Sequence, residues 1–117
     1  MIRIAIAALA ACLIGHAALA HAFLDHAVPA AGSQVAQAPA ALQLGYTEGV
    51  EPAFSTVTVT DSSGNRVDRA SLTAQQDGHV LIVPLKPLPP GTYAVEWHVT
   101  SVDTHKTQGH FTFTVTH

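Results

Sequence analysis

The stretch that decides the fold reads Gly91-Thr92-Tyr93-Ala94-Val95-Glu96-Trp97-His98-Val99-Thr100-Ser101. Large apolar residues alternate in it with small or polar ones, which is the period of a β-strand with one buried face. Pro89-Pro90-Gly91 suits a type II turn directly before it, because proline presets one φ and glycine supplies the positive one. The pattern therefore predicts a long half-buried strand over residues 92–101.

A second strong strand is predicted over residues 110–116, where Phe111, Phe113 and Val115 alternate with polar residues. Weaker segments of the same kind cover residues 23–27, 42–46, 55–60, 66–74 and 79–85. They are separated by turn signals, including Asp77-Gly78, which favours a two-residue hairpin turn.

No stretch after the first 20 residues has a sustained helical period. Seven short strands with turn signals at this spacing predict an all-β fold, a seven-stranded antiparallel Greek-key sandwich or barrel of the Ig-like or cupredoxin-like kind. We expect Trp97, Phe111 and Phe113 at the centre of its core.

The N-terminus has the features of a cleaved export signal. Arg3 is followed by an apolar run over residues 4–15, and Ala18 and Ala20 fit the A-x-A cleavage pattern. The run is shorter than the roughly 20 residues that cross a bilayer. We therefore expect a signal peptide over residues 1–20 and one mature domain over 21–117. Ala20-His21-Ala22 also fits A-x-A, and cleavage after Ala22 would remove His21.

Cleavage changes the composition in a way that matters for chemistry. The only cysteine, Cys12, and the only methionine, Met1, leave with the signal, so no disulfide, thiolate or thioether remains. Eight carboxylates then face four cations, and a basic surface for nucleic acid is absent. Seven histidines stay, which favours metal binding in a secreted domain without cysteine.

A mature chain that starts at His21 would carry an imidazole and a free α-amino group on one residue. An α-amine loses its proton far more readily than a lysine amine. The amine and Nδ1 can then close a chelate ring on a metal that prefers nitrogen ligands in a plane, which is Cu(II) or Ni(II).

Asp103-Thr104-His105 lies between the two strongest predicted strands. In an extended backbone residues i and i+2 face the same side, so the carboxylate and the imidazole can converge. With His21 they would offer three nitrogens and one oxygen, a complete tetragonal set for Cu(II). Zn(II) could also occupy such a site but gains nothing from square geometry. Taken alone, the triplet also fits an ordinary polar loop.

The chain resembles the CopC family of periplasmic copper-binding proteins over the whole predicted mature domain. The residues that carry this resemblance form three groups. They are His21-Ala22-Phe23-Leu24 with Pro29-Ala30-Ala31-Gly32-Ser33, then Gly91-Thr92-Tyr93-Ala94-Val95-Glu96-Trp97, and last Ser101-Val102-Asp103-Thr104-His105 with Gly109.

This resemblance implies cleavage after Ala20 and a Cu(II) site formed by His21, Asp103 and His105. It also implies that Glu48, in Leu44-Gly45-Tyr46-Thr47-Glu48, lies near the metal as a weak ligand or as an outer-shell acceptor for the N-terminal amine. A solvated loop glutamate is the other interpretation.

Some members of the family carry a methionine-rich Cu(I) site, whereas the mature chain here has no methionine. We therefore expect one Cu(II) ion per chain and no Cu(I) site. The resemblance further implies a non-enzymatic periplasmic protein that sequesters, buffers or delivers copper. Its partner would be a CopD-like inner-membrane copper transporter on a separate chain, since no spanning segment remains after signal cleavage.

Two alternatives stay open. An N-terminal histidine with a second histidine also resembles the copper brace of polysaccharide monooxygenases, although Asp103 would fill the coordination plane that such enzymes keep open. A structural β-sandwich without metal is the other. Among the remaining histidines, we expect His26, His79 and His98 at the surface, and His110 could orient His105.

Overall fold

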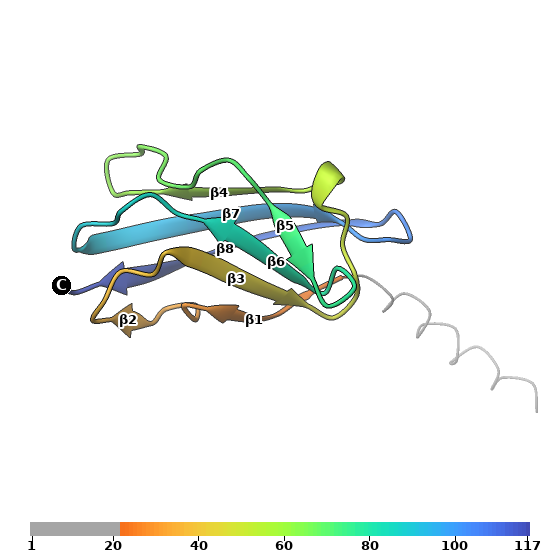
Figure 1. Cartoon of the computed structure of the whole chain (residues 1–117), viewed down its shortest axis with the longest axis horizontal. Helices are drawn as coiled ribbons and strands as arrows, with labels where there is room; N and C mark the ends of the chain where they lie inside the picture. Colours follow the sequence, from red (N-terminus) through yellow and green to blue (C-terminus); the bar gives the residue numbers. More distant parts are fainter. Residues whose placement is uncertain (1–21) are drawn as a thin grey trace, which may run out of the picture.

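The ten-residue strands β7 (Gly91–Thr100) and β8 (Lys106–Val115) form the antiparallel hairpin at the centre of the fold (Figure 1). Their register runs from Gly91 opposite Val115 to Thr100 opposite Lys106. Strand β8 starts four residues earlier than the sequence predicts. Lys106–Gly109 contains no apolar alternation, so only backbone pairing with β7 reveals it as strand. The loop between the two strands is therefore confined to residues 101–105.

The computed structural model describes residues 22–117, and these form two four-stranded sheets that pack face to face. One sheet has the order β1 (Leu24–Val28), β3 (Ala41–Tyr46), β6 (Val80–Pro84) and β5 (Thr73–Gln75). The other has the order β2 (Gln34–Val35), β8, β7 and β4 (Thr56–Thr60). A short 3-10 helix, η2 (Pro52–Phe54), precedes β4.

Without β2, the two sheets have the four-plus-three strand order of an immunoglobulin constant-type sandwich. The predicted all-β Greek-key sandwich is thus confirmed. Strand β2 adds a two-residue parallel pairing with β8, inside a segment whose small and polar residues indicate only a turn. The Tyr93 hydroxyl, near the start of β7, donates to the Pro89 carbonyl, which is the tyrosine corner of such sandwiches.

The core lies between the sheets and contains Trp97, Phe111 and Phe113, as predicted. The Trp97 ring packs edge-on against Tyr46, with ring centroids 5.3 Å apart. Opposite Trp97 on β8 stands Gly109, where a Cβ would come within 2.5 Å of Trp97 Cζ2. Gly109 is therefore needed for the close approach of the tryptophan ring to the β8 backbone.

The predicted strand over 66–74 is mostly irregular, because a buried carboxylate organises it instead. Asp68 is 3% exposed and accepts from the Val59 N–H at 2.9 Å and the Ala70 N–H at 3.0 Å. It also forms an ion pair with Arg66 at 2.9 Å. The hairpin after β5 differs too, since its loop spans the four residues 76–79 rather than Asp77-Gly78 alone.

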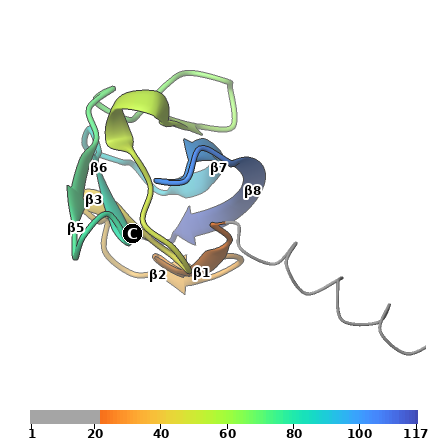
Figure 2. The same cartoon turned by 90° about the vertical axis from the view of Figure 1, so that its right-hand side faces the viewer.

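The start of the described chain, the β7–β8 loop, the β5–β6 loop and η2 gather at one end of the sandwich, and the C-terminus lies at the other (Figures 1 and 2). No helix within residues 22–117 is long and apolar enough to cross a bilayer. The predicted signal peptide, residues 1–20, and the proposed ligand His21 lie outside the described residues.

Candidate metal centre

The loop over residues 101–105 is a tight turn rather than the extended segment that the sequence suggested. The Thr104 N–H donates to the Ser101 carbonyl at 2.9 Å, and the Ser101 N–H donates to the His105 carbonyl at 2.8 Å. Thr104 has a φ of 74°, in the left-handed region. The Val102 N–H donates to the Gly49 carbonyl at 3.0 Å, which anchors the loop to the segment after β3.

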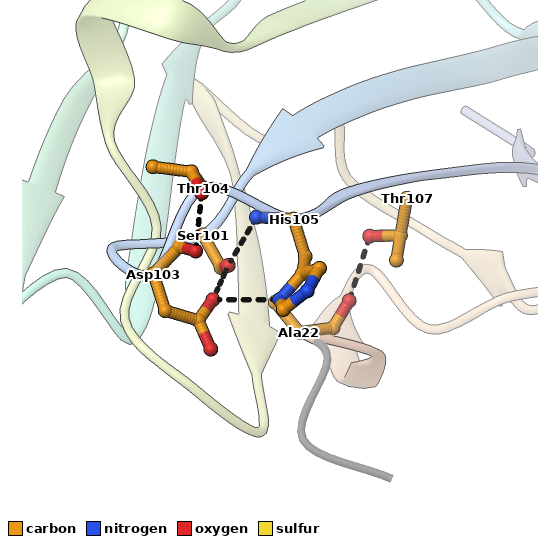
Figure 3. A network of polar contacts seen from close by, with 6 residues as sticks. All are labelled: Ala22, Ser101, Asp103, Thr104, His105 and Thr107. Carbon is orange, nitrogen blue, oxygen red and sulfur yellow. Dashed lines mark hydrogen bonds and ion pairs between the residues drawn. The ribbon is translucent and has the colours of Figure 1, made fainter. Parts of the chain in front are cut away.

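The turn brings the side chains of Asp103 and His105 together, as predicted, but through the left-handed residue between them. His105 Nδ1 lies 3.2 Å from Asp103 Oδ1, and both side chains are about half exposed. Figure 3 shows this pair, with dashed lines that link Ser101 to Asp103 and to the backbone nitrogen of His105. Two potential metal ligands are therefore adjacent and accessible from solvent.

Ser101 links both members of the pair. Its hydroxyl donates to Asp103 Oδ1, and its oxygen accepts the His105 backbone N–H at 3.2 Å. The hydrogen bond from Ser101, with a further contribution from His105, lowers the pKa of the Asp103 carboxyl below its ordinary value. Asp103 is therefore an anionic oxygen donor at neutral pH.

Hydrogen bonds hold the first described residues, Ala22 and Phe23, at the same end of the sandwich as this pair. Ala22 is 1% exposed, and its carbonyl accepts from the Thr107 hydroxyl at 2.7 Å (Figure 3). The next residue, Phe23, donates its N–H to Thr47 Oγ1 at 3.0 Å and accepts the Thr47 N–H at 2.9 Å. Thr107 belongs to β8 and Thr47 follows β3, so the two sheets hold the segment from both sides.

Sequence reasoning missed these holding contacts. Thr107 lies between the predicted strands over 92–101 and 110–116 and was therefore expected in a loop. Thr47 was noted only as part of the segment Leu44–Glu48, without a role of its own. No periodic signal could have found either, because their partners are 85 and 24 residues away.

The two remaining candidate residues, Glu48 and His110, differ in where they lie relative to the Asp103–His105 pair. Glu48 follows Thr47 and precedes Gly49, whose carbonyl anchors the loop, so it lies at the same end of the sandwich. His110 lies opposite Glu96 on the exposed face of β8, five residues beyond His105, and does not support it.

In the part of the chain that the structure describes, no three His, Cys, Asp or Glu side chains lie close enough to hold a metal ion. Asp103 and His105 are thus an adjacent pair of potential ligands, and a four-ligand tetragonal site at this position would need two further donors.

Comparison with known proteins agrees with the resemblance to the CopC family and extends over most of the chain. The CopC domain model matches residues 24–116. The chain is 46% identical over 116 residues to protein YobA of Escherichia coli K12, an alignment that covers 97% of this chain and 94% of YobA.

Two solved structures share the fold. CopC from Methylosinus trichosporium OB3b superposes with a TM-score of 0.77 at 36% identity, covering 82% of this chain and 94% of that one. PcoC, a methionine-rich copper resistance protein from Escherichia coli, has a TM-score of 0.72 at 36% identity, covering 82% of this chain and 99% of that one.

Proposed function

The chain belongs to the CopC family, and from this premise we propose that it is an exported protein that binds one Cu(II) ion. Its mature N-terminus, His21, would supply two nitrogens, while His105 and Asp103 would supply a third nitrogen and an oxygen. The protein would sequester, buffer or deliver the ion without catalysing a reaction.

The observation that carries this proposal is the docking of Ala22 onto Thr107, which lies two residues beyond His105 on the chain. Consecutive Cα atoms are about 3.8 Å apart across a trans peptide, so a residue bonded to Ala22 starts that close to it. A chain cut after Ala20 would carry its amine one residue before Ala22, at the end of the sandwich where Asp103 and His105 lie. Within residues 22–117 no third His, Cys, Asp or Glu side chain joins the pair, so a complete ligand set would need donors such as those of His21.

The donor types favour cupric rather than cuprous copper. Amine, imidazole and carboxylate suit a tetragonal Cu(II) site, whereas Cu(I) prefers thiolate and thioether ligands. The only methionine is Met1 and the only cysteine is Cys12, both in the predicted signal. We therefore propose a Cu(II) site and no methionine Cu(I) site in the mature chain.

Glu48 is proposed as an outer-shell group that accepts a hydrogen bond from the N-terminal amine, because it lies at the same end of the sandwich as the pair. The proposed location is the periplasm, and the proposed recipient is a CopD-like inner-membrane copper transporter.

The decisive experiment compares the protein that starts at His21 with the same protein acetylated at its N-terminal amine. Cu(II) titration and electron paramagnetic resonance should show one saturable site in the first. The acetylated protein should lose affinity by orders of magnitude, because its terminal nitrogen is an amide without a basic lone pair and the amine–imidazole chelate ring cannot form. His105→Ala should also weaken binding, whereas His110→Ala, a matched exposed histidine on β8, should not.

Two outcomes would contradict the proposal. Equal affinity with and without the acetyl group would exclude the N-terminal chelate. Recovery of a periplasmic protein that starts at Phe23, read by mass spectrometry, would remove the ligand altogether. Cleavage of a polysaccharide by the copper-loaded protein with ascorbate and peroxide would instead support the oxidative enzyme.

A further inference from the structure

We propose that Ser101 is the positioning residue of the copper site, because one buried hydroxyl fixes both ligands that the β7–β8 loop contributes. This inference rests on the proposed Cu(II) site. It concerns a residue that binds no metal itself but determines how Asp103 and His105 are presented to it.

Every polar group of Ser101 is directed at the loop that bears the ligands. Its N–H donates to the His105 carbonyl at 2.8 Å, and its carbonyl accepts the Thr104 N–H at 2.9 Å. Its hydroxyl oxygen accepts the His105 N–H at 3.2 Å, and its hydroxyl proton goes to Asp103 Oδ1. Ser101 is 1% exposed, so solvent has no route to replace these bonds if the hydroxyl is removed.

These contacts orient each ligand in a definite way. The Ser101 hydroxyl and His105 Nδ1 both contact Asp103 Oδ1, and Figure 3 shows Oδ2 pointing away from both. Ser101 therefore sets the position of the Asp103 carboxylate and of the backbone from which the His105 imidazole projects.

A general effect on stability has to be separated from this role, and the chain contains a matched control. Ser55 is 7% exposed and uses its hydroxyl in the same two ways. It donates to the Glu51 carbonyl at 2.7 Å and accepts the Thr100 N–H at 3.1 Å. Within residues 22–117, the two hydrogen bonds of the Ser55 hydroxyl go to Glu51 and Thr100 and to neither ligand. Ser55→Ala therefore removes an equivalent buried hydroxyl near the same end of the sandwich.

The test measures Cu(II) affinity and the paramagnetic resonance spectrum of Ser101→Ala, Ser101→Thr and Ser55→Ala, all starting at His21. Loss of an outer-shell partner typically lowers metal affinity about 10- to 100-fold, and we expect a loss of that size in Ser101→Ala. Its copper hyperfine splitting should also change, because Asp103 is no longer held in place. Ser101→Thr keeps the hydroxyl and should restore both, and Ser55→Ala should stay within about twofold of the unmodified protein.

Several results would overturn the inference. One is a Ser101→Ala protein with unchanged affinity and spectrum, and another is an equal loss in Ser55→Ala. If circular dichroism shows that Ser101→Ala does not fold, Ser101→Thr decides: retained affinity and spectrum support the inference, and their loss in a folded protein overturns it. An unmodified protein that binds no copper would overturn the proposed function as well, whereas normal binding with an unaffected Ser101→Ala would overturn this inference alone.

Discussion

Replacing Thr107 by valine tests whether the sandwich pre-positions the N-terminus for copper. The substitution keeps the branched shape of the side chain and removes only the hydroxyl. That hydroxyl donates to the Ala22 carbonyl at 2.7 Å, a contact between β8 and the first described residue. Without this hydroxyl, Ala22 loses its hydrogen bond to β8, while the bonds between Phe23 and Thr47 stay.

The magnitude follows from the single bond that is lost. A partly buried hydrogen bond contributes a net ~0.5–1.5 kcal/mol. If the N-terminal segment detaches when the bond is absent, copper binding must order it again and loses up to that free energy. Since 1.4 kcal/mol corresponds to a factor of ten, the Cu(II) affinity of Thr107→Val should fall about two- to tenfold.

Competition titration against a chelator of known Cu(II) affinity resolves a change of this size. Thr114→Val is the matched control. It also removes a threonine hydroxyl from β8, one that lies 3.1 Å from Thr92 Oγ1, at the far end of the strand. We expect its affinity to be unchanged. Equal affinities for both variants would refute the idea that Thr107 helps to place the metal-binding terminus.

Three further predictions concern stability and the outer shell. Asp68→Asn should destabilise the fold by about 2–4 kcal/mol at neutral pH, measured by urea unfolding, because charge-assisted bonds to buried donors are lost. Burial raises the pKa of Asp68, but Arg66 and two backbone N–H groups outweigh it and leave the pKa lowered. The stabilisation is thus present above the ordinary aspartate pKa and is lost as the pH falls through the pKa of Asp68 in the folded protein. The difference in free energy of unfolding between Asp68→Asn and the unmodified protein should therefore shrink in acid. A difference that does not depend on pH would contradict this. Gly109→Val should lower the melting temperature through a clash with Trp97, at a cost of about 1–3 kcal/mol, and an unchanged melting temperature would show that the ring can move aside. Glu48→Gln should weaken Cu(II) binding severalfold if its carboxylate accepts from the N-terminal amine, and unchanged affinity would identify it as a solvated loop residue.

The periodic part of the fold could be predicted from the sequence because alternation is a local property. The apolar face of β7 and the aromatic core around Trp97 are confirmed. Strand β2 and the first four residues of β8 escaped prediction, since they are strands only by virtue of the partner beside them. The segment around Asp68 escaped for a related reason: a buried carboxylate, not side-chain period, fixes its path.

The sequence by itself determined which chemical groups are available: a candidate N-terminal histidine, an Asp-x-His triplet, and no thiol or thioether outside the predicted signal. Only the tertiary structure decided how the described groups are arranged. It placed Ala22 against Thr107, and it turned Asp103 toward His105 through a left-handed Thr104 and a buried Ser101 hydroxyl. The physical reason is that residue types and spacing are written along the chain, whereas a hydrogen bond between residues 85 positions apart leaves no pattern there.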